Sequence, residues 1–377
     1  MTEYRKALEH EEADILDFIN YVFSQAHRPH DFKRLLPKVY AHKGFYRYHY
    51  VAVENGRIRG TVAVLPVEMP FGDGQSLKIG YVGSVSAHPY DKGAGHMKKL
   101  MQLMLEDTKD QYDLLALGGR RQRYQYFGFE CGGARLRFEV NADNVRHALK
   151  DVQCRMQLRE ITECGDAVLD DIHALCEKKA FCCAREREQL LDIMHSWEGR
   201  LYALEDESGL LGYLYTKGAD FLEEIGLTDE SRIGELIKAY MAMTGQKKVF
   251  VRVNPLNKVR AHYVKNFAEK WQLADNEMMH VISWQRTLEA LLGFKGDCQP
   301  LTDGRFVFEV EDAGRFAIEV RQHGVRVTET EEEPLMVMAH NKAVEFFFSP
   351  YTAMMTSSPM LKSWLPVPFG MYSVDEF

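Results

Sequence analysis

The chain has 377 residues, of which 46% are hydrophobic and 27% are charged, and its formal net charge is −8. This length predicts two or three domains, and the composition is typical of a globular protein and excludes a largely disordered one. The negative charge argues against nucleic acid as the main partner. No apolar run in the sequence is long enough to span a bilayer, so we expect no membrane association.

The first residues, MTEYRKALEHEEADI, lack the basic start and apolar core of a secretory signal, so we expect a cytoplasmic protein. The seven cysteines form no Cys-x-x-Cys pair, and we expect reduced thiols that are mostly buried. The segment CEKKAFCC, residues 176–183, matches no common spacing of metal ligands. We therefore expect no metal site.

The first segment, residues 1–143, is predicted to mix helices and strands. Apolar residues at helical spacing predict a helix over residues 11–23, and residues 48–69 predict two strands joined by a tight turn at Asn55-Gly56. A turn at residues 70–76 and a strand at 77–87 follow. A helix then presents an apolar face, and a further strand lies within residues 112–119. The apolar face consists of Met97, Leu100, Met101 and Met104.

The second segment, residues 144–290, repeats this rhythm: a helical region, a hairpin over 201–217, a helix over 233–243 and a strand over 247–253. It has no glycine-rich loop between strand and helix, so it reads as a degenerate copy of the first. In the third segment, residues 291–377, the stretches 304–312 and 314–324 alternate apolar and polar residues, as strands with one buried face do. Together these patterns predict an α+β fold.

The stretch PYDKGAGHMKKLM, residues 89–101, places two glycines where a strand gives way to a helix. Gly93 and Gly95 expose bare backbone, and the first N–H groups of a helix lack intrahelical partners. A pyrophosphate is therefore able to accept hydrogen bonds from residues 93–98, with positive charge from Lys92, His96 and Lys98. The alternative is an ordinary tight turn. The stretch lacks the further residues of a dinucleotide or nucleoside-triphosphate loop.

In its context this loop resembles the acetyl-CoA loop of the GNAT N-acetyltransferases, Arg/Gln-x-x-Gly-x-Gly/Ala at a helix start. Here it reads Lys92-Gly93-Ala94-Gly95-His96-Met97, with Lys for Arg or Gln and Met for the final small residue. A second block, Tyr124-Gln125-Tyr126-Phe127-Gly128-Phe129, resembles the Tyr-x-x-x-Gly-Phe element of that family. The resemblance implies that Tyr124 is the general acid that protonates the departing thiolate, whereas Tyr126 packs.

The same resemblance implies acetyl-CoA as co-substrate, with no metal. Its binding residues would be Val85, Ser86, Ala87, Lys92, Gly93, Ala94, Gly95, His96, Met97, Lys98, Gly119 and Arg120. Of these, residues 85–87 would offer their backbone to the pantetheine arm, because an arm in a splayed sheet pairs like an added strand. Val85 also fits a core position of its strand, and the two roles are compatible.

Over its whole length and in its ending FGMYSVDEF, the chain resembles the Eis (enhanced intracellular survival) aminoglycoside acetyltransferases. This implies a catalytic GNAT domain over 1–143, a degenerate GNAT-like domain over 144–290 and a sterol-carrier-protein-like α/β domain over 291–377. In that family the last residue is a Phe whose α-carboxylate lies in the first domain's active site, so Phe377 would be the general base. The alternative is a plain C-terminal anchor. The family also forms homo-oligomers, often hexamers.

The sequence thus predicts acetyl transfer from acetyl-CoA to a primary amine of a small molecule or peptide, such as an aminoglycoside or polyamine. Direct transfer in a ternary complex is expected, because no cysteine lies in either motif. The alternative is an acyl-CoA- or lipid-binding protein without turnover. Asp375 and Glu376 form either an acidic rim for a cationic acceptor or a solvated tail. The resemblance to GNAT folds implies that the basic stretch 26–34 borders the acceptor side, and His27 and His30 are expected to be loop or surface residues.

Overall fold

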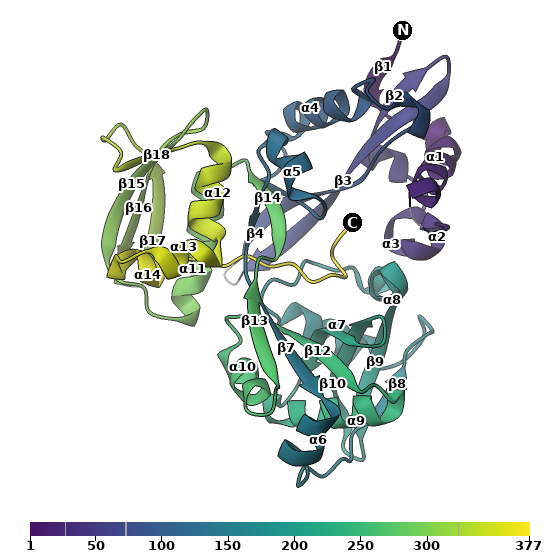
Figure 1. Cartoon of the computed structure of the whole chain (residues 1–377), viewed down its shortest axis with the longest axis vertical. Helices are drawn as coiled ribbons and strands as arrows, with labels where there is room; N and C mark the ends of the chain where they lie inside the picture. Colours follow the sequence, from purple (N-terminus) through teal and green to yellow (C-terminus); the bar gives the residue numbers. More distant parts are fainter. Residues whose placement is uncertain (27, 72–73, 323) are drawn as a thin grey trace. The chain divides into compact units, whose positions relative to one another are not determined.

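The computed structural model describes residues 1–26, 28–71, 74–322 and 324–377 (Figure 1). Its internal contacts divide the chain into two units, each assembled from separate stretches of sequence. Unit 1 comprises Met1–Gly132, Glu277–Pro368 and Glu376–Phe377, and unit 2 comprises Gly133–Asn276 and Phe369–Asp375. Each unit is described by itself below.

The larger sheet of unit 1 has seven strands in the order β1-β2-β3-β4-β5-β14-β6. The predicted hairpin is confirmed, because Asn55 (φ 51°) and Gly56 (φ 71°) both adopt the left-handed backbone of a two-residue turn. The turn predicted at 70–76 includes residues 72–73, which lie outside the described part of the chain. The strands are β1 (Glu3–Lys6), β2 (His49–Glu54), β3 (Arg57–Phe71), β4 (Gln75–Ala87), β5 (Leu114–Leu117), β14 (Glu277–Val281) and β6 (Glu130–Gly132).

Helices α1 (Glu12–Ala26) and α4 (His96–Thr108) confirm the two helices predicted for the first segment. The predicted apolar face of α4 is buried at Leu100, Met101 and Met104, whereas Met97 is half-buried. These side chains pack with Val64, Val82 and Leu115 of the sheet into one core cluster. The shorter helices of this stretch are α2 (Phe32–Leu35), α3 (Pro37–Tyr40) and α5 (Arg121–Tyr124).

Unit 2 holds a second seven-stranded sheet in the order β13-β7-β12-β11-β10-β9-β8. The hairpin predicted over 201–217, the helix over 233–243 and the strand over 247–253 correspond to β9 and β10, α9, and β12. The strands are β7 (Arg135–Asn141), β8 (Gln157–Glu160), β9 (Gly199–Asp206), β10 (Gly209–Lys217), β11 (Phe221–Leu227), β12 (Lys248–Val253) and β13 (Lys270–Ala274). The helices are α6 (Ala142–Ala148), α7 (Leu169–Glu177), α8 (Leu190–His195), α9 (Ile233–Thr244) and α10 (Lys258–Lys265).

Two strands lie in a different sheet from the one that the predicted segments would give them. β7 precedes residue 143, yet it pairs with β12 and β13 in the sheet of unit 2. β14 precedes residue 290, yet it pairs with β5 and β6 in the larger sheet of unit 1. The chain therefore passes from one sheet to the other before β7 and again before β14, and not at the boundaries 143 and 290 predicted from the sequence. The domain ranges 1–143, 144–290 and 291–377 remain predictions.

The third segment forms a four-stranded sheet in the order β17-β16-β15-β18, and the predicted one-faced strands are confirmed as β15 and β16. Phe306 and Phe308 of this sheet contact Phe346 and Phe347, and helices α11 and α12 lie along one face (Figure 1). Its likeness to a sterol carrier protein remains a prediction. The elements are α11 (Trp284–Cys298), β15 (Gly304–Val310), β16 (Gly314–Arg321), β17 (Gly324–Glu329), β18 (Met336–Met338), α12 (His340–Phe348), α13 (Pro350–Met355) and α14 (Pro359–Trp364).

The cysteines are all free thiols, but fewer are buried than the composition led us to expect. Cys176, Cys182 and Cys183 are buried, Cys131 is half-buried, and Cys154, Cys164 and Cys298 are exposed. Among the described residues, no three or more histidine, cysteine or carboxylate side chains lie together as metal ligands would. Within the same residues, no helix has both the length and the apolar character to cross a membrane.

Three histidines of unit 1 are held without charge by their surroundings: His49 is buried, whereas His280 and His340 are half-buried. Burial lowers the pKa of His49 to about 3 and that of His280 to about 4, from an ordinary value of 6.5. Burial, with a smaller effect of His280, lowers the pKa of His340 to about 3. The rings of His280 and His340 stack with their centroids 4.2 Å apart, which joins β14 to the third segment inside unit 1.

We predict that these histidines make the protein sensitive to mild acid. Unfolded histidines take up protons as the pH falls below about 6.5, whereas the folded ones remain neutral down to about pH 4. The free energy of unfolding should therefore be greatest above pH 6.5 and fall by about 1.4 kcal/mol per pH unit for each histidine. Urea midpoints between pH 7.5 and 4.5 would measure the slope, and His340→Gln should reduce it. An unchanged slope in that variant would contradict the assignment.

A buried charge cluster lies in unit 2. Arg185 donates to both oxygens of Glu224, at 3.0 and 2.9 Å, and to both oxygens of Asp375, at 2.9 Å each. The three side chains are at most 3% exposed, and Lys179 lies 3.2 Å from Glu224. Burial alone would raise the pKa of Glu224, but Arg185 and Lys179 hold it well below its usual range. Asp375 is thus neither an acidic rim nor a solvated tail, because its carboxylate is enclosed by Arg185.

We predict that Arg185→Met lowers the free energy of unfolding by about 3–5 kcal/mol, because it leaves two carboxylates buried without their guanidinium. Urea unfolding of the full chain would measure the loss. Arg159→Met is the matched control, because Arg159 also binds two carboxylates, Asp166 and Glu205, but is 45% exposed. It should cost about 1 kcal/mol or less. If the two variants lose the same free energy of unfolding, burial does not increase the contribution of Arg185 to stability, and the prediction is wrong.

Candidate active site

Strands β4 and β5 part inside unit 1. Their parallel pairing ends at Tyr81 and Ala116, whereas β4 continues to Ala87. The register of β4 against β3 also shifts there, because Ser84 and Val85 lie between the pairs Ala63–Gly83 and Thr61–Ser86 and face one residue of β3. A β-bulge bends the strand that carries it, and this one follows directly on the last pair of β4 with β5. It leaves residues 82–87, with the predicted Val85, Ser86 and Ala87, along one side of an opening in the sheet.

The predicted loop lies where β4 leads into α4. Gly93 (φ 90°) and Gly95 (φ 79°) both have left-handed backbones, and Gly95 caps the helix. A Cβ atom at either glycine would meet nothing within 4 Å, so these positions require glycine for their backbone angles and not for lack of space. Because a helix cannot supply partners for its first N–H groups, those of residues 96–98 are directed at the loop. Their partial positive charge suits an anion.

The three cationic side chains of this loop differ in placement. Lys92 and Lys98 are exposed, and the Lys98 ammonium lies 4.8 Å from the centre of the Tyr126 ring. His96, in contrast, is 6% exposed, and its Nδ1 atom lies 2.9 Å from the Tyr4 hydroxyl. Its Nε2 atom lies 3.7 Å from Asp91 Oδ2, so the ring is enclosed between Tyr4 and Asp91 and is not exposed at the rim. Tyr126 is 63% exposed, so it is not the packing residue that its spacing suggested.

Tyr124 ends the short helix α5 and is only 6% exposed. Gly119, which follows β5 at φ 146°, lies so close that a Cβ atom there would be 2.7 Å from the Tyr124 ring. Burial raises the pKa of Tyr124 above its ordinary value of 10, although Arg123 opposes this in part. The hydroxyl therefore stays protonated at neutral pH, as a proton donor must. Arg120, the other residue predicted at this turn, is exposed.

A buried carboxylate fixes helix α5. Glu130 is 2% exposed and accepts bonds from Arg121 Nε at 2.5 Å, from Gln125 Nε2 at 2.7 Å and from the Cys131 backbone N–H at 2.8 Å. Burial alone would raise the pKa of Glu130, but these donors together hold it below its usual range. Because Arg121 and Gln125 flank Tyr124 in the chain, this ionised carboxylate holds the tyrosine in place.

The last residue of the chain packs against β4. A Cβ atom at Gly83 would lie 2.3 Å from the Phe377 ring, so the ring rests directly on the strand's backbone. The ring also stacks on Tyr40 with 6.1 Å between centroids, and Lys38 Nζ donates to the carbonyl of Glu376 at 2.5 Å. Neighbouring residues of a strand point to opposite faces. Gly83 faces Phe377, whereas Val82 packs in the cluster that contains Tyr124. The two predicted catalytic residues thus approach β4 from opposite faces.

A buried chain of polar side chains supports the bulge, and no motif in the sequence indicated it. The Tyr40 hydroxyl lies 2.6 Å from Ser84 Oγ and 3.1 Å from His49 Nε2. His49 Nδ1 lies in turn 2.9 Å from Thr61 Oγ1. Ser84 has a left-handed backbone (φ 50°), which is uncommon for a residue with a side chain. These bonds connect the bulge to α3, β2 and β3, and they hold Tyr40 beneath Phe377.

In unit 2 the pairing of β11 with β12 also ends before β11 does, and a side chain binds the strand there. The parallel pairs of β11 with β12 are Phe221–Phe250 and Leu222–Val251, whereas β11 continues to Leu227. Arg260, which is 6% exposed, donates to the carbonyl of Ile225 at 2.8 Å. Asp229 caps the turn before α9 through the Ser231 backbone N–H. The Arg260 guanidinium thus binds the backbone where β11 and β12 part, and the Asp229 carboxylate lies at the turn before α9. Side chains are therefore found at the positions that a bound ligand and a glycine-rich loop would need.

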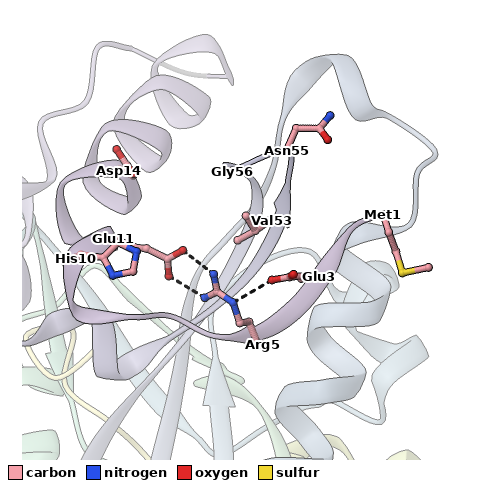
Figure 2. Close-up of a pocket in the computed structure, with 9 residues that line it drawn as sticks. All are labelled: Met1, Glu3, Arg5, His10, Glu11, Asp14, Val53, Asn55 and Gly56. Carbon is pink, nitrogen blue, oxygen red and sulfur yellow. Dashed lines mark hydrogen bonds and ion pairs between the residues drawn. The ribbon is translucent and has the colours of Figure 1, made fainter.

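A pocket of about 490 Å³ elsewhere in unit 1 contains none of the predicted site residues. Figure 2 shows that Arg5 points at Glu3 and Glu11, and its bonds to the two Glu11 oxygens are 2.9 and 2.8 Å long. The guanidinium is thus already neutralised, and the pocket is an open polar hollow and not a second reaction site. Of the two histidines in the basic stretch 26–34, His30 is a half-buried loop residue whose ring lies near those of Phe23 and Phe32, and His27 lies outside the described residues.

Comparison with known proteins agrees with this geometry. Residues 3–132 match the family model of the acetyltransferase (GNAT) domain. The fold of the whole chain is similar to GCN5-related N-acetyltransferases from Anabaena variabilis (16% identity, TM-score 0.71) and Kribbella flavida (16%, 0.66). It is also similar to Eis1 from Mycobacterium abscessus (15%, 0.64). Each comparison covers 100% of both chains. A search of curated proteins gives no match. Residues 3–132 therefore form an acetyltransferase domain of the GNAT family, and the chain that carries them is an acetyltransferase.

Proposed function

We propose that this protein transfers an acetyl group from acetyl-CoA to a primary amine, by direct attack in a ternary complex. The observation that carries the proposal is that β4 parts from β5 with Tyr124 on one face and Phe377 on the other. A thioester lying in this opening is accessible to a proton donor from one face and to an amine with a carboxylate from the other. The acceptor class remains an amine of a small molecule or peptide, such as an aminoglycoside or polyamine.

The cofactor would run along β4 and end at the start of α4. Its pyrophosphate would accept bonds from the backbone N–H groups of the 93–98 loop, with Lys92 and Lys98 at the rim. Its pantetheine arm would pair with the backbone of residues 85–87, as an added strand does. Backbone N–H groups near the bulge would stabilise the oxyanion that forms when the amine attacks the carbonyl carbon.

The two catalytic roles follow from protonation. Tyr124 keeps its proton at neutral pH, so it is able to donate that proton to the sulfur as the carbon–sulfur bond breaks. The α-carboxylate of Phe377 would attract the ammonium and take up one of its protons, directly or through a water molecule. The balance is one amide bond formed, one thioester bond broken and one proton released. A homo-oligomer, implied by the resemblance to the Eis family, remains a prediction that light scattering would test.

We predict that Tyr124→Phe lowers kcat by about 100-fold or more, the usual contribution of a general acid. Release of free thiol from acetyl-CoA, with aminoglycosides, polyamines and lysine peptides as acceptors, would measure the rate. Tyr126→Phe is the matched control, because it removes the same hydroxyl two residues further along the chain. It should leave kcat nearly unchanged. A Tyr124→Phe enzyme that keeps the native rate would exclude this tyrosine as the acid.

We further predict that one glycine added after Phe377 lowers kcat by about 100-fold while the KM for acetyl-CoA stays the same. The added residue moves the terminal carboxylate away but leaves the phenylalanine ring and its contact with Gly83 in place. The same thiol assay would measure the effect. Phe377→Leu without an extension is the control, since it keeps the carboxylate and changes the ring. If the extended chain is as active as the native one, Phe377 is only an anchor.

A further inference from the structure

A row of aromatic rings leads from Tyr124 into the third segment of the chain, all within unit 1. Tyr124 and Phe129 meet edge to face, with 6.4 Å between ring centroids, and Phe129 lies 5.5 Å from His280 of β14. His280 stacks on His340 at 4.2 Å, and Trp284 lies 5.5 Å from His340. Because Trp284 and His340 are the first residues of α11 and α12, the row connects the proposed acid to two helices of the third segment.

His280 also lies against the turn that follows Tyr124. Gly128 has a left-handed backbone (φ 79°), and a Cβ atom at this position would lie 2.8 Å from His280 Nδ1 and 3.6 Å from His340 Cδ2. Hydrogen bonding to the backbone of Phe127 and Gly128 opposes in part the lowering of the His280 pKa by burial. The two imidazole rings therefore rest on the backbone of the turn, where only glycine leaves them room.

The turn transmits this contact to Tyr124 through its backbone hydrogen bonds. The Gly128 N–H donates to the Gln125 carbonyl at 3.0 Å, and the Phe129 N–H donates to the Tyr124 carbonyl at 3.2 Å. Phe129 is fully buried, so its ring moves only if its neighbours move. Glu130 fixes helix α5 before the turn through Arg121 and Gln125, whereas His280 fixes the turn itself.

We propose that His280, supported by His340, is a positioning residue that holds the Tyr124 hydroxyl where it donates its proton. This inference rests on the proposed function and adds a residue outside the glycine loop, the tyrosine motif and the chain end. His280 acts through the turn and not on the reacting atoms. Its ring is uncharged at neutral pH, because burial lowers its pKa to about 4, so it carries no imidazolium proton to give to the thiolate.

Placement of the acid affects the chemical step more than it affects the binding of the cofactor. A proton donor has to lie within hydrogen-bond reach of the sulfur as the carbon–sulfur bond breaks. A displacement of about 1 Å is enough to lower the rate by up to about 100-fold. Cofactor binding is proposed to depend instead on the 93–98 loop and on β4, so kcat and KM should respond differently to a change at His280.

The test is a double-mutant cycle between His280 and Tyr124. We expect His280→Ala to lower kcat about tenfold or more, while the KM for acetyl-CoA changes by less than about twofold. In the Tyr124→Phe enzyme the same change should lower kcat no further, because its effect passes through the hydroxyl that is already missing. The thiol-release assay, with the acceptor that the native chain acetylates fastest, would measure all four chains.

Two further variants separate placement of the acid from stability of the fold. His280→Gln keeps a hydrogen-bond donor beside the turn and should recover part of the rate that His280→Ala loses. Phe316→Leu is the matched control, because Phe316 is 4% exposed in the same unit and its ring packs on Phe308 of the four-stranded sheet. It should lower the melting temperature, as His280→Ala does, but leave kcat nearly unchanged.

A second measurement does not depend on turnover. In protein labelled with fluorotyrosine, the fluorine NMR resonance that disappears in Tyr124→Phe belongs to Tyr124. His280→Ala should shift or broaden this resonance, because the ring of Tyr124 loses its fixed position. Phe316→Leu should leave the resonance where it is in the native chain.

The outcomes distinguish this inference from the proposed function. If Tyr124→Phe is slow but His280→Ala keeps the native rate and the native resonance, the proposed function stands and the positioning role is rejected. The role is also rejected if His280→Ala lowers kcat by the same factor with and without the Tyr124 hydroxyl, since the defect is then a general one. If Tyr124→Phe keeps the native rate, both the acid and its positioning residue are rejected.

Discussion

The separation of β4 from β5 beyond Tyr81 is the constraint on which the rest of the site depends. In a continuous sheet the backbone N–H and C=O groups of each strand bond to the neighbouring strands, which leaves no room for a thioester between them. Here the bulge at Ser84 and Val85 bends β4 while β5 ends at Leu117. The polar chain from Ser84 through Tyr40 to His49 holds the bend. Because His49 is buried and its pKa is lowered to about 3, its imidazole is neutral where it supports the strand.

Unit 2 also contains two parallel strands whose pairing ends before the strands do, but it has no glycine-rich loop beside them. Its strands β11 and β12 also part, but Arg260 reaches into the opening and binds the carbonyl of Ile225. Glu230 holds that guanidinium at 2.7 and 2.6 Å, so the charge that fills the opening is balanced from within the unit. A strand that parts from its neighbour must satisfy its backbone in some way. Unit 2 does so with a side chain, whereas in unit 1 we propose the pantetheine arm in that role.

The last residues of the chain are held by contacts within each unit. Within unit 1, Lys295 Nζ donates to the carbonyls of Trp364 and Pro366 at 2.7 and 3.0 Å, and the ring of Phe377 packs on Gly83. Within unit 2, Asp375 is enclosed by Arg185. Termini are usually mobile unless they are tied down. These contacts fix the backbone on both sides of the last turn, and that order is what a catalytic role for the final carboxylate would require.

Local features of this protein were determined by the sequence alone. Glycines at 93 and 95 and the Asn55-Gly56 turn specify left-handed backbone that few other residues adopt, and the apolar face of α4 follows from a 3.6-residue period. The spacing from Tyr124 to Phe129 identified the tyrosine that proves to be buried beside the sheet. Each of these signals lies within a few residues, so no knowledge of the wider fold is needed to read it.

Only the tertiary structure decided which distant residues meet. Tyr81 and Glu277 are 196 positions apart and Arg185 and Asp375 are 190 apart, and no local pattern brings such residues together. The placement of β7 and β14 in their sheets likewise depends on which edges are open when the strands pair. Burial then gives these residues their chemistry, because the same His49 or Asp375 in a solvated loop would be an ordinary surface group. The sequence thus determined the glycine loop and the tyrosine that we propose as the acid, and the fold determined which residues surround them.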